Sequence, residues 1–337
     1  MEKVTLSKIA ESAGVSIGTA SRVLSGKAEK YRISKETAVK VRAAARELSY
    51  KPLHIEANIK TDKVNLIGLV IPSLKNQYFA EMASVVITEA GKLGYSVIVF
   101  DSMEDEKVLF KAVSTLLEKK VDGMIIAPCG DDPMWLEQID ATLVPVVLID
   151  RFYEDTTLSY VTTDNFSGAV KAVNYLIKNG HKNIACIAGV PSSMPNQERV
   201  AGYKKAMCDA GLEEYINVSG DDFTIRGGYL ATKLLLQGPG HPTALFALAG
   251  MIMLGSLKAI READLRVPED ISIISFDNYF YMDFMEPSLV RMDQPYVDIC
   301  SLAVKILFEK MEKKRMSATR IRLSPNLIEG KSVALRK

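Results

Sequence analysis

Residues that could bind a hydroxylated small molecule follow six apolar, β-branched runs of the chain. Carboxylates and amides exchange hydrogen bonds with hydroxyl groups, and flat aromatic faces cover the apolar side of a sugar ring or a base. The segments concerned are residues 73–79, 101–102, 150–151, 190–199, 222–223 and 277–278. This pattern indicates ligand recognition, with capping of the helices that follow each run as the alternative.

The residue pattern gives little support for enzyme chemistry. The sequence has no Gly-x-Gly-x-x-Gly opening a helix, no P-loop and no Gly-x-Ser-x-Gly, and nothing pairs the acids with a nucleophile. The four cysteines, Cys129, Cys186, Cys208 and Cys300, are scattered and form no Cys-x-x-Cys pair. We therefore expect no catalytic residues, no cofactor and no metal site, and hence no enzyme.

A second set of candidate residues lies near the N-terminus, where residues 4–24 (VTLSKIAESAGVSIGTASRVL) predict two short helices. Thr5 and Ser16 can cap these helices, and Gly14 supplies the turn between them. The inward residues are expected to be Leu6, Ile9, Ala10, Ala13, Ala20, Val23 and Leu24. The outward face of the second helix is small, polar and basic, with Ile17, Gly18, Thr19, Ser21 and Arg22. Such a face suits the DNA major groove, although an ordinary helical hairpin is the alternative.

The charge distribution favours nucleic acid binding. Residues 1–60 hold 12 Lys and Arg against 6 Asp and Glu, which leaves 30 against 35 in the rest of the chain. The near-neutral total of +1 therefore hides a basic head on a mildly acidic body. This asymmetry is typical of a protein that places one end on DNA.

The elements that must position these residues fall into two classes. A third helix is expected from Lys35 to about Ser49, and a polar linker follows at residues 53–62. From Leu66 onward, apolar β-branched runs alternate with helical stretches in two sets, about 63–160 and 161–290. Such alternation predicts parallel sheets covered on both faces. We expect an N-terminal all-α head and an α/β body of two doubly wound parallel-sheet lobes, with ligands beyond the carboxyl ends of the strands.

The sequence shows no segment typical of secretion or membrane insertion. MEKVTLSKIAE has no apolar signal core, and no run of about 18 uncharged apolar residues could span a bilayer. The scattered cysteines fit small core residues in a reduced compartment. We expect a cytoplasmic protein with no membrane partner.

Motifs in a characteristic order run through the whole chain. They are VTLSKIAESAGVSIGTASRVL, GLVIP, NQYFAE, KKVDGMIIAP, VTTDN, NYLIKNGHKNIACIAG, ERVAGY, LRVPEDISIISFDN and MDQP. Together they resemble the LacI/GalR family of bacterial transcription regulators, in which MDQP resembles the strand that returns to the first lobe. The resemblance implies a helix-turn-helix DNA-binding domain at 1–50 and a hinge at 51–62. It implies a periplasmic-binding-protein-like effector-binding and dimerisation domain at 63–337, with an N-lobe at about 63–160 and 292–321 and a C-lobe at about 161–291 and 322–337.

The resemblance also implies which residues meet DNA. They are Thr5, Leu6, Ser16, Ile17, Gly18, Thr19, Ser21, Arg22 and Ile59. Arg22 is the expected base reader, because a guanidinium can bond guanine O6 and N7 together. Ile59 takes the place of the apolar wedge that a hinge inserts into the minor groove.

Effector contacts are implied between the two lobes. The resemblance places them at Asn76, Tyr78, Phe79, Arg199, Phe223 and Asp277, and the strand-end pattern adds Asp101 and Arg151. One departure stands out, since the family often has Asn-Asp where this chain has Ala249 and Gly250. A polar clamp on the effector has therefore become apolar.

The expected function is sequence-specific repression of carbohydrate-utilisation genes, controlled by a sugar or sugar derivative bound between the lobes. A homodimer on a palindromic operator is expected, because one head buries too little surface to select a site. The alternative is a soluble cytoplasmic sugar-binding protein without operator activity. The effector's identity, its direction of control and the choice between dimer and tetramer stay open.

Overall fold

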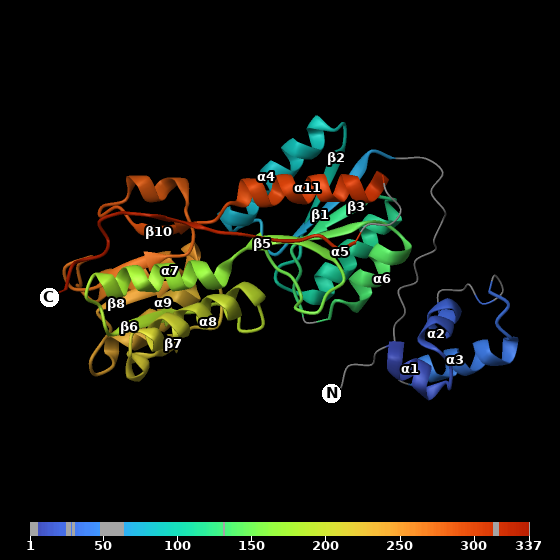
Figure 1. Cartoon of the computed structure of the whole chain (residues 1–337), viewed down its shortest axis with the longest axis horizontal. Helices are drawn as coiled ribbons and strands as arrows, with labels where there is room; N and C mark the ends of the chain where they lie inside the picture. Colours follow the sequence, from blue (N-terminus) through green and yellow to red (C-terminus); the bar gives the residue numbers. More distant parts are fainter. Residues whose placement is uncertain are drawn as a thin grey trace. The chain divides into compact units, whose positions relative to one another are not determined.

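The computed structural model describes residues 6–24, 28, 31–47, 64–130, 132–312 and 317–336. The chain divides into two compact units, residues 1–62 with 114–120 and residues 63–113 with 121–337; residues 1–62 are called the head and residues 63–337 the body (Figure 1). Thr5, Ile59, the side chain of Leu6 and the expected hinge at 51–62 lie outside the described residues.

Three helices build the head, namely α1 (Leu6–Ser12), α2 (Ile17–Leu24) and α3 (Lys35–Glu47). Gly14 has a φ of 65° in the turn between α1 and α2, which confirms the expected left-handed glycine. Ile9, Ala20 and Val23 are buried in one core with residues of α3, as their helical spacing predicts. The outward residues of α2 are therefore held on a small, rigid support.

The first sheet of the body contains six parallel strands in the order β11-β5-β4-β3-β1-β2. They are β1 (Leu66–Ile71), β2 (Ser96–Asp101), β3 (Gly123–Ile126), β4 (Val146–Ile149), β5 (Ser159–Thr163) and β11 (Arg320–Leu323). Strands β3, β4 and β5 are buried along their whole length, which explains why β3 and β4 are continuous apolar runs.

The second sheet repeats this arrangement in the order β12-β10-β9-β8-β6-β7. Its strands are β6 (Ile184–Ile187), β7 (Asn217–Ser219), β8 (Ala244–Ala247), β9 (Ser272–Ser275), β10 (Val290–Asp293) and β12 (Asn326–Ile328). All neighbours are parallel except β10 and β12, which pair antiparallel at the edge. Two doubly wound lobes are thus confirmed for the body.

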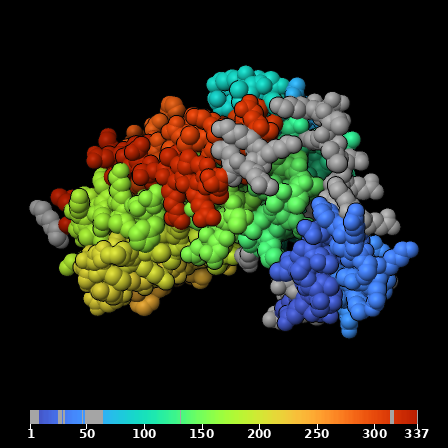
Figure 2. All heavy atoms as spheres, turned by 45° about the vertical axis from the view of Figure 1, so that its right-hand side comes forward, coloured from blue at the N-terminus to red at the C-terminus, as the bar shows by residue number. Residues whose placement is uncertain are grey.

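Helices cover both sheets (Figure 1). The first lobe has α4 (Gln77–Lys92), α5 (Glu106–Glu118), α6 (Met134–Thr142) and α11 (Tyr296–Glu312), and the second has α7 (Asn165–Lys178), α8 (Met194–Asp209), α9 (Ile225–Gln237) and α10 (Gly250–Glu262). Short 3-10 turns, η1 (Glu213–Tyr215) and η2 (Phe280–Phe284), complete the second lobe. Figures 1 and 2 show the red C-terminal segment beside the light-green α7, which contacts β12.

The MDQP segment differs from the expectation that it forms a strand of the first lobe. Strand β10, which contains Met292 and Asp293, pairs in parallel with β9 of the second sheet. The chain crosses to the first lobe only at Gln294 and Pro295, before α11 begins. Since the chain also crosses between the lobes after β5 and after β11, Gln294 lies among three connecting segments.

The cysteines follow the expectation of core residues only in part. Cys129, Cys186 and Cys300 are buried, whereas Cys208 on α8 is exposed, and all four are free. Cys208 falls outside the core because it lies on the solvent side of an otherwise packed helix. Among the helices in the described ranges, none is both long and apolar enough to cross a bilayer.

Candidate functional site

The head presents hydroxyl groups at the start of α2. Ser16 Oγ accepts a hydrogen bond from the backbone N–H of Thr19 at 3.1 Å, which confirms Ser16 as the helix cap. The same oxygen lies 2.9 Å from Thr19 Oγ1. Because helix N-termini carry a partial positive charge, these two hydroxyls are suited to a phosphate group.

An arginine and an exposed apolar residue complete the outward face of α2. Ile17 is 50% exposed, which leaves its side chain available to a thymine methyl group. The guanidinium carbon of Arg22 lies 4.3 Å from the ring centroid of Tyr31, a cation–π contact that limits the rotamers of the arginine. The sequence did not identify Tyr31, because its contact with Arg22 is a tertiary one that local sequence spacing does not reveal.

A cavity of about 370 Å³ lies between the two lobes of the body. First-lobe loops provide Glu104, Pro128, Cys129, Gly130, Pro133, Arg151, Phe152, Tyr153, Glu154 and Asp155, and the loop and helix after β6 provide Val190, Ser192, Ser193, Met194 and Gln197. The cavity therefore lies beyond the carboxyl ends of parallel strands from both sheets, where ligands of such folds bind. Its volume suits a small molecule.

An ion pair between Arg151 and Glu104 forms one wall of the cavity. Arg151 Nη1 and Nη2 donate to the two carboxylate oxygens of Glu104 at 2.6 and 2.7 Å. Burial lowers the pKa of Arg151, but the hydrogen bonds and charge of Glu104 raise it further, so the guanidinium stays charged. Glu104 and Asp150 have positive φ values of 57° and 61°, and such strained residues concentrate at functional sites.

Two buried polar atoms at the cavity have no hydrogen-bond partner among the described residues. They are Nε of Arg151 and Oγ of Ser193, each in a residue 7% exposed. Oδ2 of Asp150 lies 3.8 Å from Arg151 Nε, beyond hydrogen-bond distance. Buried polar groups normally have a partner, so these two atoms are places where a ligand hydroxyl or a water would bind.

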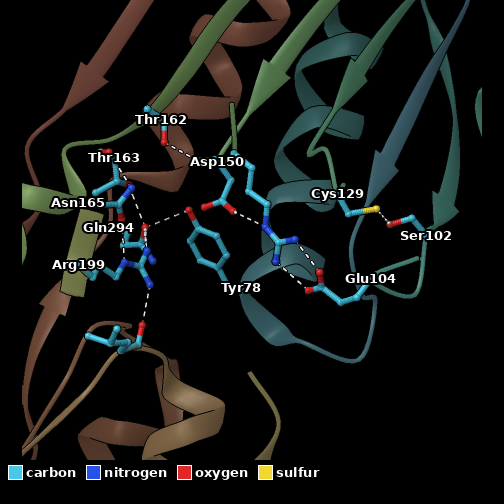
Figure 3. A network of polar contacts seen from close by, with 12 residues as sticks. Tyr78, Ser102, Glu104, Cys129, Asp150, Thr162, Thr163, Asn165, Arg199 and Gln294 are labelled. Atoms are coloured by element: carbon cyan, nitrogen blue, oxygen red, sulfur yellow. Dashed lines mark hydrogen bonds and ion pairs between the residues drawn. The ribbon is translucent and has the colours of Figure 1, made fainter. Parts of the chain in front are cut away.

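Arg199 is buried, and each of its three side-chain nitrogens donates a hydrogen bond to the protein (Figure 3). Nε donates to Asn165 Oδ1 at 2.8 Å, Nη1 to the carbonyl of Leu248 at 2.7 Å, and Nη2 to Gln294 Oε1 at 3.2 Å. Its guanidinium carbon lies 3.9 Å from the ring centroid of Phe276. Burial lowers the pKa of Arg199. Three of its five N–H groups are used by these bonds, and its contact with an effector stays a prediction.

Asp277 is also enclosed. Its Oδ2 accepts from the backbone N–H of Gly250 at 2.6 Å and its Oδ1 from Gln294 Nε2 at 2.7 Å. Burial raises the pKa of Asp277, while the charge of Arg199 lowers it. The Tyr279 hydroxyl lies 3.2 Å from Oδ2, so protein groups already surround this carboxylate.

Three expected effector residues lie at the start of α4, and each makes a different contact. Asn76 caps the helix, since its Oδ1 accepts from the backbone N–H of Tyr78 at 3.1 Å. The Tyr78 hydroxyl donates to Gln294 Oε1 at 3.3 Å (Figure 3). Phe79 lies beside Arg151, with 5.8 Å between its ring centroid and the guanidinium carbon.

Phe223 and Asp101 have different surroundings. The Phe223 ring centroid also lies 5.8 Å from the Arg151 guanidinium carbon, and the ring rests on Gly189, where a Cβ would be only 2.2 Å away. Asp101 holds loops, because its carboxylate accepts from the backbone N–H groups of Leu74 and Met103 at 2.9 and 2.8 Å. Asp101 therefore ties two loops together, whereas Asn76 caps α4 and Asp105 accepts from backbone N–H groups at the start of α5.

Of the eight expected effector residues, Arg151 lines the cavity. Loops 150–151 and 190–199 reach it as expected, but sequence reasoning missed Glu104 and Ser193 as individual residues. Glu104 belongs to the acidic stretch after β2, and this was the available signal for it. Gln294, which joins Tyr78, Arg199 and Asp277, was visible only as part of the MDQP motif.

Two regions of the chain match known protein families. Residues 5–52 match the family described as bacterial regulatory proteins, lacI family. Residues 173–333 match the family described as periplasmic binding protein-like domain. The two matches fall on the helical head and on most of the second lobe together with α11.

Similar proteins span nearly the whole chain. The ribose operon repressor of Escherichia coli (strain K12) is 31% identical over 329 residues, covering 96% of this chain and 98% of that protein. The HTH-type transcriptional repressor PurR of Pectobacterium carotovorum subsp. carotovorum (strain PC1) is 33% identical over 336 residues, covering 98% and 97%.

Solved structures give the same picture. A complex of the transcriptional regulator CelR with cellobiose has a TM-score of 0.75 at 26% identity, covering 98% of this chain and 100% of that chain. The lac repressor dimer bound to operator and the anti-inducer ONPF has a TM-score of 0.73 at 28% identity, covering 99% and 100%.

Proposed function

The chain belongs to the lacI family of bacterial regulatory proteins, and we propose that it represses carbohydrate genes under the control of a small effector. Its relatives are transcriptional repressors, so it is a DNA-binding regulator and not an enzyme. The observation that supports the proposal most strongly is similarity to repressors over more than nine-tenths of the chain. The names of the ribose operon repressor and of the CelR complex with cellobiose favour a carbohydrate response.

In this proposal α2 is the recognition helix and enters the major groove. Arg22 reads a guanine, Ile17 contacts a thymine methyl, and the hydroxyls of Ser16 and Thr19 bind phosphates. The remaining proposed DNA contacts are Thr5, Leu6, Gly18, Ser21 and Ile59. The basic balance of residues 1–60 supports this assignment, since phosphate contacts supply much of the affinity for DNA.

A homodimer on a palindromic operator is the proposed assembly. The lac repressor in the matching structure is a dimer bound to its operator, which supports this state. The body also exposes large apolar side chains, including Leu234 at 68%, Phe280 at 70% and Phe284 at 83%. Such side chains are candidates for burial against a second copy.

The interlobe cavity is the proposed effector site, and its charges favour a neutral ligand. Three carboxylates line it, Glu104, Glu154 and Asp155, whereas Arg151 is the cation among its lining residues and is already paired with Glu104. A phosphate or carboxylate on the ligand would face these acids and lose its hydration. An uncharged hydroxylated molecule would instead satisfy Nε of Arg151 and Oγ of Ser193.

The test is selection of random DNA duplexes by the full-length protein at fixed, near-physiological salt. It is run without effector and with neutral pentoses, hexoses and disaccharides beside their phosphates. The proposal predicts an enriched two-fold palindrome and a change in its enrichment with a neutral sugar. A folded protein that enriches no sequence but binds a sugar by calorimetry would favour the sugar-binding protein without operator activity.

A further inference from the structure

Gly250 and Tyr279 lie against each other where the second lobe meets the first-lobe loop before α4. Tyr279 is 2% exposed, and a Cβ added to Gly250 would lie 2.2 Å from Cε2 and 2.7 Å from Cζ of its ring. No heavy atoms approach this closely, so residue 250 must lack a side chain for the ring to fit. The apolar Ala249-Gly250 pair and the tyrosine are therefore complementary in size.

The hydroxyl of Tyr279 connects the two lobes. It lies 2.9 Å from Oδ1 of Asn76, in the first-lobe loop before α4, and 3.2 Å from Oδ2 of Asp277, at the end of β9. A single phenol proton can serve either acceptor, and both acceptors belong to expected effector residues. The phenol thus makes the hydrogen bonds that a ligand hydroxyl would make in this position.

The backbone around Tyr279 is held independently of any ligand. Asn278 accepts from Nε of Arg291 at 2.6 Å and donates to Oδ1 of Asp293 at 3.0 Å. The backbone N–H of Tyr279 contacts Sδ of Met282 at 3.5 Å. The ring is therefore placed in advance by the residues on either side of it, and its position does not require an effector.

We propose that Tyr279 is a built-in occupant of the inner end of the effector site and ties the lobes together without a ligand. Its phenol takes the space over Gly250 and gives the Asp277 carboxylate a partner within the protein. The space that remains for an effector is the outer cavity beside Arg151. The size of residue 279 therefore determines which ligands fit. This role in specificity rests on the proposed effector site, whereas the tie between the lobes does not.

Hydrogen–deuterium exchange on the full-length, ligand-free protein tests the tie. Tyr279→Phe keeps the ring and removes the hydroxyl, so exchange in peptides covering residues 76–81 should rise about fivefold, the effect of one net hydrogen bond. Tyr281→Phe is the matched control, because the Tyr281 ring centroid lies 5.5 Å from that of Tyr279, and it should leave these peptides unchanged. Equal exchange in Tyr279→Phe, Tyr281→Phe and the wild type would overturn the proposal.

Chemical rescue tests the occupied space. Tyr279→Ala removes the phenol and should leave a cavity that binds p-cresol, the free form of the tyrosine side chain. Millimolar p-cresol should return exchange of residues 76–81 in Tyr279→Ala to within about twofold of the wild-type value, because it restores both the ring and the hydroxyl without the covalent link. Tyr281→Ala should show no response to p-cresol. If Tyr279→Ala folds and its exchange does not change with p-cresol, the proposal that the ring occupies this space is refuted. If this variant does not fold, the exchange of Tyr279→Phe decides the proposal.

These measurements separate the tie from the proposed function, since they use neither DNA nor an effector. A negative duplex selection would leave the exchange result standing, and unchanged exchange would leave an enriched palindrome standing. The role of Tyr279 in ligand specificity is tested by measuring binding of the same neutral sugars that are used in the duplex selection. Tyr279→Ala should bind at least one larger saccharide that the wild type rejects, and an unchanged set of ligands would refute a role for Tyr279 in specificity.

Discussion

Replacing Tyr31 by alanine should weaken operator binding even though Tyr31 is not itself proposed to read a base. The Arg22 guanidinium carbon lies 4.3 Å from the Tyr31 ring centroid, and Tyr31 is 46% exposed. An exposed cation–π contact contributes about 0.5–1 kcal/mol, and a dimer has two of them. The expected loss is therefore about 1–2 kcal/mol, or roughly 5- to 30-fold in Kd for the palindrome.

The assay is fluorescence anisotropy with the selected palindrome at fixed salt. Tyr31→Phe is the control, because it keeps the ring face and should bind about as well as the wild type. The slope of log affinity against log salt should not change, since no phosphate contact is removed. Wild-type affinity in Tyr31→Ala, or an equal loss in Tyr31→Phe, would refute the idea that the ring positions Arg22.

Three further predictions concern the body. Glu104→Gln should lower the free energy of unfolding by about 1–3 kcal/mol in urea titrations, less than for a fully buried ion pair because Glu104 is 36% exposed; unchanged stability would contradict a structural ion pair with Arg151. Burial raises the pKa of Asp150 from 3.8, so the free energy of unfolding of the wild type should fall as the pH rises through that raised pKa. Asp150→Asn should reduce this fall, and parallel curves of unfolding free energy against pH for the two proteins would contradict the prediction. Phe284→Glu should shift the dimer toward monomer in sedimentation, whereas Leu335→Glu should not, and a stable dimer in both would place the interface elsewhere.

Local sequence patterns were sufficient for the elements themselves. Gly14 and Ser16 predict a turn and a helix start through properties of single residues, namely a positive φ and a side-chain cap. The central strands β1, β3, β4, β6 and β8 were visible because strands buried on both faces are apolar along most of their length. The second half of β10, Met292 and Asp293, was assigned to the wrong lobe, since the MDQP motif does not record which neighbouring strand it pairs with.

The site was predictable only to the level of its loops. The rule that ligands bind beyond the carboxyl ends of parallel strands identified loops 150–151 and 190–199, which line the cavity. The same rule included Asp101, although its carboxylate is used to hold two loops. A carboxylate at a strand end serves either purpose, and the sequence contains nothing that separates them.

The sequence by itself determined the family, the helical head, the two-lobed body and the chemical types available at the strand ends. The tertiary structure alone decided which of these residues face a cavity and which face each other. Arg199 and Asp277 have ligand-binding chemistry, yet Gln294 and neighbouring backbone groups already satisfy them. The physical reason is that a buried polar group must be paired, and its partners come from segments far apart in the chain. The contact between Tyr279 and Gly250 likewise depends on the tertiary structure, because only folding brings these two residues together.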